Sequence, residues 1–182
     1  MAITGIVGLK SLIYERAKWV SPARRSYEWP GPLAWSECSF CPKDDEGHII
    51  IRQSCTCGLY ATLWDDEFRD YMMEDAIGFL VEAIGHIIQP HAAHTWAHTH
   101  GFTSSGLLIV AAVNLTRTKS THGRWVQDGG NVIRDLNKHY YLLKKAEHDF
   151  NIPIINYDEA RIIMQTMWTT HNLPWPTDIP RI

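Results

Sequence analysis

The chain lacks the features that would assign it at once to a membrane, a secretory route or a common enzyme class. No apolar run approaches the roughly 18 residues that a membrane-spanning helix needs. The first residues contain no basic region followed by an apolar stretch, so we expect no export signal and a cytoplasmic protein. Nucleophile-elbow, phosphate-loop and zinc-protease motifs are also missing. These absences favour a binding protein over an enzyme.

A large excess of charge of either sign is missing as well. The 182 residues include 17 Lys and Arg against 20 Asp and Glu, a net charge of −3 with neutral histidines. Such a balance offers no broad attraction to nucleic acid or to an anionic membrane. The hydrophobic fraction of 45% is sufficient to bury a core, and the length fits one domain over residues 1–182.

Cysteine is scarce, yet all four cysteines fall within twenty residues: Cys38, Cys41, Cys55 and Cys57. They form two close pairs, and the turn-forming residues 44–47 lie between the pairs. A chain that folds back at this turn brings four thiolates to one point, as a tetrahedral zinc ion requires, with Zn–S distances of about 2.3 Å. We predict a structural zinc site in a hairpin segment of about residues 36–61.

Other uses of these cysteines are less favoured. Two disulfides require an oxidising compartment, for which the sequence gives no indication, and a redox-active pair needs no second pair beside it. His48 is a competing ligand that can replace one of the cysteines in a Cys3His site. Four protein ligands leave no coordination position for water, so a catalytic zinc ion is not expected.

Histidines form a second cluster within fifteen residues: His86, His91, His94, His98 and His100. If residues 93–100 form a strand, His94, His98 and His100 project from one face and can chelate a transition metal. No carboxylate lies close in this segment, and small residues alternate with the histidines. We therefore prefer a solvated strand, with a metal-dependent enzyme that uses these histidines as an alternative.

Hydrophobic periodicity predicts a single α+β domain. Strand-like patterns cover residues 3–15, 79–88, 93–100 and 107–113, and residues 151–156 read as an extended link. Helical patterns cover residues 64–74, 131–150 and 158–171, with Tyr140 on the apolar face of the second and Ile162 on that of the third. We expect about five antiparallel strands, three helices, and a C-terminal helical part over residues 131–182.

Two polar segments read as loops. Residues 20–35 are rich in Pro, Arg and Ser, and residues 116–130 contain three glycines. Residues 101–106, which contain two further glycines, read as a break between strands. Basic residues are scattered over these loops and could form one nucleic-acid-binding patch if the fold gathers them: Arg24, Arg25, Arg52, Arg117, Lys119 and Arg124.

Residues 55–61 read C-T-C-G-L-Y-A, and His48 stands seven residues before Cys55. Cys38 follows a Trp-Pro-Gly stretch at residues 29–31. In these features the chain resembles a group of small proteins from actinobacteria and their phages that carry a C-x-C-G-[IL]-Y-A signature. The resemblance implies the zinc site and an intracellular bacterial or phage setting, and it implies no particular activity.

The likeness extends to an N-terminal Gly-containing strand at residues 5–14 and to the link Phe-Asn-Ile-Pro at residues 150–153. The sequence departs from the group at residues 49–52, where a proline-containing spacer is usual, and Cys41 is additional. Either Cys41 or His48 can thus be the fourth ligand. Our first hypothesis is a zinc-stabilised, non-enzymatic protein that binds a host or cellular macromolecule, most simply a protein, with a nucleic acid as the alternative partner.

Overall fold

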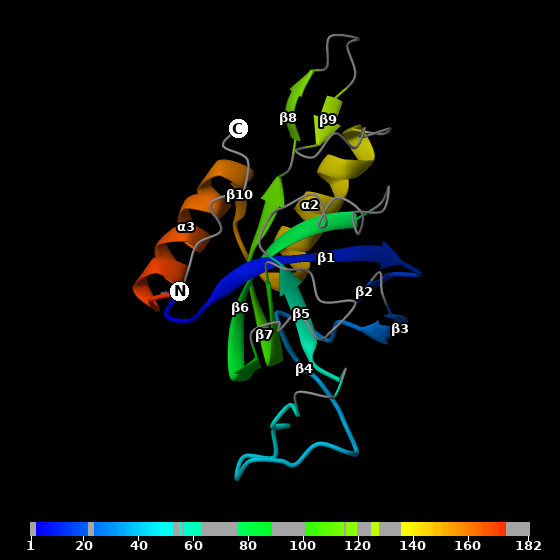
Figure 1. Ribbon diagram of the computed structural model, residues 1–182. Coiled ribbons are helices and arrows are strands. Elements are labelled where there is room, and N and C mark those ends of the chain that lie inside the picture. Colours follow the sequence, from blue (N-terminus) through cyan, green and yellow to red (C-terminus); the bar gives the residue numbers. More distant parts are fainter. Residues whose placement is uncertain are drawn as a thin grey trace.

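The computed structural model describes residues 3–21, 24–52, 55, 57–62, 76–88, 101–114, 116–119, 125–127 and 136–173. These residues form an eight-stranded sheet, a separate two-stranded sheet and two helices (Figure 1). The α+β class is therefore as predicted, although the sheet is larger than the expected five strands. The elements are β1 (Val7–Glu15), β2 (Lys18–Ser21), β3 (Arg24–Glu28), β4 (Leu33–Trp35), β5 (Leu59–Thr62), β6 (Ala76–Ile88), β7 (Gly101–Asn114), β8 (Thr116–Lys119), β9 (Trp125–Gln127), α2 (Leu136–Phe150), β10 (Ile154–Asn156) and α3 (Tyr157–Thr170).

Strands β6 and β7 form the centre of the sheet. They pair antiparallel from Gly78↔Val113 to Ile88↔Thr103, and β6 pairs with β1 along its other edge. The free edge of β7 takes β5, β4 and β10 in turn. Because β5 also meets β1 at Leu9↔Thr62, strands β1, β6, β7 and β5 close a circuit of pairings. Residues 76–83 are all buried, which explains why this part of β6 is apolar except for Glu82.

The sheet is mixed, whereas the sequence predicted an antiparallel one. Strand β10 lies parallel to the end of β7, with Ile154 opposite Ala112 and Asn156 opposite Asn114. The chain passes through α2 between these two strands, and a helical crossover is the connection that returns a strand in the parallel direction. The extended link predicted for residues 151–156 thus becomes an edge strand.

Aromatic side chains tie the helices to the sheet. The ring of Phe79 on β6 meets Trp19 and Phe150 edge-on, with centroid distances of 5.5 and 5.7 Å. The indole of Trp19 donates a hydrogen bond to Asp149 Oδ2 at 2.9 Å, and the indole of Trp168 donates to the Val7 carbonyl at 2.8 Å. Each tryptophan therefore buries apolar area and satisfies its one polar atom.

Both helices were predicted, but in each of them one residue that was expected on the apolar face is exposed. In α2 the buried side chains are His139, Leu142, Leu143, Ala146 and Phe150. Tyr140, which was expected on the apolar face, is 43% exposed. The buried face of the helix contains the preceding residue, His139, in its place. Helix α3 is capped by Asn156, the residue before its first turn, whose side chain forms a capping box with that of Glu159. Ile162 is 64% exposed, and Ala160, Met164 and Trp168 face the sheet instead.

Three segments that we read as irregular contain strands. Residues 20–35 include part of β2 and all of β3 and β4, and residues 116–130 include β8 and β9. Residues 101–106 belong to β7, where the glycines admit neighbouring groups and do not break the strand. The predicted helix at 64–74 and the predicted strand at 93–100 lie outside the described residues.

Glycines make room for Trp35 beside the central pair. A Cβ atom on Gly106 would lie 2.7 Å from the Trp35 ring, and one on Gly85 would lie 3.1 Å from it. Gly85 also has a φ of +75°, which other residues rarely adopt. The side chain of Trp35 thus lies directly on the backbone of β6 and β7.

We expect Gly106→Ala to destabilise the protein by about 1–3 kcal/mol, because the added methyl group must push the Trp35 ring out of its place. Gly31→Ala is the matched control, since no atom lies within 4 Å of a Cβ at Gly31. Urea unfolding of the two variants measures the difference. Equal unfolding midpoints would show that the Trp35 ring is not held tightly.

His139 should make stability depend on pH. Burial lowers the pKa of His139 from 6.5 to about 4, and its Nε2 has no hydrogen-bond partner among the described residues. Between these pH values the unfolded chain binds a proton that the folded chain does not, so acidification favours unfolding. The loss should amount to roughly 3 kcal/mol from pH 6.5 to pH 4. The free energy of unfolding of wild type and His139→Leu, measured over this range, should diverge as the pH falls. Parallel curves would contradict the assignment.

Candidate metal centre

The register of β7 sets the two ends of the cysteine segment side by side. Trp35, the last residue of β4, lies opposite Gly106, and Leu59, the first residue of β5, lies opposite Ser104. Only Ser105 separates them along β7, a distance of about 7 Å at the usual strand rise. The segment of residues 36–58 therefore starts and ends at neighbouring positions on the same edge of β7. We call these residues the cysteine lobe; Figure 1 shows it extending from the sheet on the side away from α2 and α3.

A tight turn gives the lobe its hairpin shape. Lys43 and Ile49 form an antiparallel bridge, and the Asp44 backbone N–H donates to the His48 carbonyl at 2.8 Å. The carboxylate of Asp44 accepts hydrogen bonds from the backbone N–H groups of Glu46 and His48 at 3.0 and 2.8 Å. Gly47 supplies the positive φ, at +86°, that closes the turn. The turn predicted at residues 44–47 is present.

This fold brings the four thiols together. The Sγ atoms of Cys38 and Cys55 are 3.7 Å apart, those of Cys41 and Cys57 are 3.5 Å apart, and all four lie within 4.8 Å of one another. Sulfurs bound to a tetrahedral zinc ion at about 2.3 Å are separated by about 3.8 Å. A disulfide requires about 2.05 Å, and all four cysteines are free thiols. The arrangement can therefore hold a metal ion.

The surroundings of the thiols are partly apolar. Cys41 packs with Ile49 and Ile51 in a small cluster of buried residues that is separate from the main core. Gly58 follows directly after Cys57, and a Cβ atom there would lie 2.0 Å from the Thr103 side chain and 2.9 Å from that of Ile51. Packing therefore explains the glycine of the C-x-C-G sequence: β5 pairs with β7 immediately after the last thiol, and a larger residue would collide with β7 there.

The thiols differ in how readily they lose a proton. The backbone N–H of Phe40 points at the Cys38 sulfur, 3.4 Å away, and lowers the pKa of this thiol to about 7. Burial, followed by the neighbouring thiols, raises the pKa of Cys57. A metal ion must therefore displace protons from the site. Its affinity should rise with pH through the neutral range, since thiolates are the ligands.

His48 lies on Trp35 instead of joining the thiols. The two rings are stacked, with centroids 3.7 Å apart and an angle of 9° between their planes. The Nδ1 atom of His48 is 3.4 Å from a carboxylate oxygen of Glu46 and 3.7 Å from one of Asp44. Among the described residues, the group that can share one metal ion contains the four cysteines and not His48.

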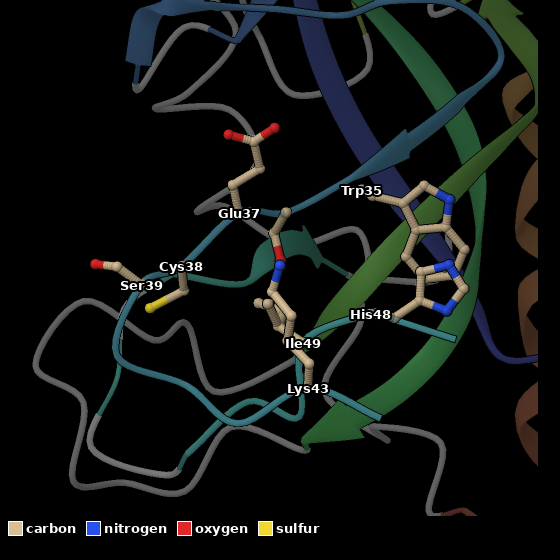
Figure 2. A pocket seen from close by; sticks show the side chains of 9 residues that line it. Trp35, Glu37, Cys38, Ser39, Lys43, His48 and Ile49 are labelled. Carbon is tan, nitrogen blue, oxygen red and sulfur yellow. The ribbon is translucent and has the colours of Figure 1, made fainter. Parts of the chain in front are cut away.

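A pocket of about 560 Å³ opens between Cys38 and this stacked pair (Figure 2). The Cys38 thiol lies on one side of it, and the rings of Trp35 and His48 lie on the other. Glu37 and Lys43 bring one charge of each sign to its wall. No sequence motif indicates this pocket, because the pocket depends on the pairing of β4 with the distant strand β7.

The other predicted site residues are not gathered in the described part of the chain. Of the histidine cluster, only His86 is described; it is exposed on β6, and its backbone N–H donates to Ser105 Oγ at 2.9 Å. His91, His94, His98 and His100 lie outside the described residues. Of the basic side chains, only Arg52 is described, and it is exposed on the cysteine lobe.

No protein-family model, curated protein or solved structure matches the chain. Neither of the helices in the described ranges is long and apolar enough to cross a membrane. The chemistry of the site itself, in which four thiols converge, is therefore the basis for a functional assignment.

We expect Cys55→Ser to lose the bound metal and His48→Ala to keep it, because only the first change removes a sulfur from the cluster. Elemental analysis of both purified variants, with wild type beside them, measures the metal per chain. Loss of metal from His48→Ala would assign the imidazole a ligand role and overturn the four-cysteine site.

Proposed function

We propose that the protein is a zinc-stabilised, non-enzymatic binding protein of the cytoplasm that acts on a host or cellular macromolecule. The observation that carries this proposal is the convergence of four thiols, the full ligand set of a tetrahedral ion. Thiolates favour zinc among the common divalent ions. A zinc ion with four protein ligands has no position for an activated water molecule, and its role is structural.

Zinc would hold in place a segment that has little else to order it. Among the described residues of the cysteine lobe, those that are buried and apolar are Cys41, Ile49 and Ile51. So small a cluster offsets only part of the conformational entropy that is lost when the lobe is fixed. Metal binding supplies the remaining free energy, so the shape of the lobe should depend on zinc.

The resemblance of residues 55–61 to an actinobacterial and phage signature supports a bacterial setting for this activity. In a small bacterial or phage protein, a metal ion that orders one exposed lobe gives that lobe a defined shape. Such a lobe is suited to bind the surface of another macromolecule. For a phage-encoded chain, the natural target is a protein of the host.

Zinc removal should lower stability and abolish binding together. We expect one zinc per chain after purification without chelator, and increased proteolysis within residues 36–58 after chelation. Wild type that carries an affinity tag should retain a partner from an actinobacterial lysate, and Cys55→Ser should not. A protein without zinc would contradict the structural role, and a partner retained equally by Cys55→Ser would contradict the role of the lobe in binding.

A further inference from the structure

The cysteine lobe presents a large aromatic side chain to water. Phe40 lies between the ligand candidates Cys38 and Cys41, and 81% of it is exposed, the largest value among the apolar residues described as exposed. Its backbone is restrained, because the Phe40 N–H donates to the Cys38 sulfur at 3.4 Å. Binding therefore has less backbone freedom to remove than at an unrestrained loop, which is favourable for an interface anchor.

The charge around Phe40 is negative. The cysteine lobe carries four exposed carboxylates, from Glu37, Asp44, Asp45 and Glu46, and two exposed cations, Lys43 and Arg52. Four thiolates around a divalent ion add a formal charge of −2. Asp44 is four residues from Phe40, so their Cα atoms are separated by at most ~14 Å. This is between one and two Debye lengths at physiological salt, so the carboxylates should act most strongly on a partner at low salt. A phosphate backbone would be repelled here, and a basic protein surface would be attracted.

The pocket beside Cys38 has side chains of both charges in its wall. It is lined by Glu37 and Lys43, and by Ser36, whose buried Oγ has no hydrogen-bond partner among the described residues. Because Lys43 already places a cation there, the pocket does not select a cationic side chain by itself. The attraction for a basic partner comes from the exposed carboxylates of the lobe.

We propose that the cysteine lobe docks onto a protein segment in which lysine or arginine side chains flank an apolar patch. Phe40 contacts the patch, and the exposed carboxylates of the lobe face the cations. This inference rests on the proposed function, since it names the class of partner that the zinc-stabilised lobe binds.

Selection from a displayed library of random peptides tests this proposal with the zinc-loaded full chain as bait. The selected peptides should be enriched in lysine and arginine next to apolar residues. They should bind Phe40→Ser at least tenfold more weakly than wild type. Tyr141→Ser is the matched control, because Tyr141 is 61% exposed on α2, and this variant should bind as wild type does. Asp45→Lys should weaken binding most at low salt.

Several outcomes overturn the proposal: no enrichment, enrichment of acidic peptides, or equal binding by Phe40→Ser. Tight binding of single- or double-stranded oligonucleotides that is lost in Phe40→Ser would also overturn it and assign the surface to nucleic acid. Zinc content and the unfolding midpoint of Phe40→Ser should match those of wild type, which separates lost contacts from lost folding. If zinc is present and a lysate partner is retained by Phe40→Ser, this inference fails while the proposed function stands.

Discussion

The antiparallel pairing of β6 with β7 is the constraint on which the rest of the structure depends. Every other strand of the main sheet except β2 and β3 pairs directly with one of these two. The helices follow, since α2 lies between β7 and β10 in the chain and rests on the same sheet through Phe79 and Phe150. Each strand that joins β7 must occupy its one free edge, so the order of β5, β4 and β10 along that edge is fixed by register. That order determines where the cysteines can meet.

Strands β4 and β5 pair with neighbouring stretches of the same edge of β7, and the cysteine lobe is the segment of chain between them. Their neighbouring ends face Gly106 and Ser104, so strand pairing alone closes the neck of the lobe. A loop whose ends are already joined has lost much of its closure entropy, and the thiols of its two arms are held near each other. The stack of His48 on Trp35 adds a second point of attachment, because Trp35 itself lies on the glycine backbone of β6 and β7. The sheet thus prepares the metal site from outside the lobe.

The parts of this structure that could be predicted are those recorded in local patterns. Four cysteines in two close pairs indicated a shared site, and the apolar run at residues 79–88 indicated a buried strand. Strands β3 and β4 were not predicted, because the sequences around Arg24, Ser26 and Trp35 show no alternation of apolar and polar residues. In addition, β3 pairs with β2 across a bulge, and β4 pairs with β7, which is distant in the sequence. Gly106 read as a strand breaker, while in the fold it makes room for an indole ring. In α2, His139 lies on the buried face and Tyr140 on the exposed face. The two faces differ by a shift of one residue, which hydrophobic periodicity alone resolves poorly.

Separate cores explain how the protein can hold an exposed surface in a defined shape. The cluster around Cys41, Ile49 and Ile51 is distinct from the main core, which contains the buried side chains of the sheet and both helices. The sheet can therefore form without the ligands, and the order of the lobe can be set by the metal and by the Trp35–His48 stack. A lobe ordered in this way needs few buried apolar residues of its own, which leaves Phe40 and the carboxylates free to face water. If a metal ion occupies the site, the same division makes the shape of this surface sensitive to anything that competes for the thiols, because coordinate bonds and one ring stack would then take the place of a larger core.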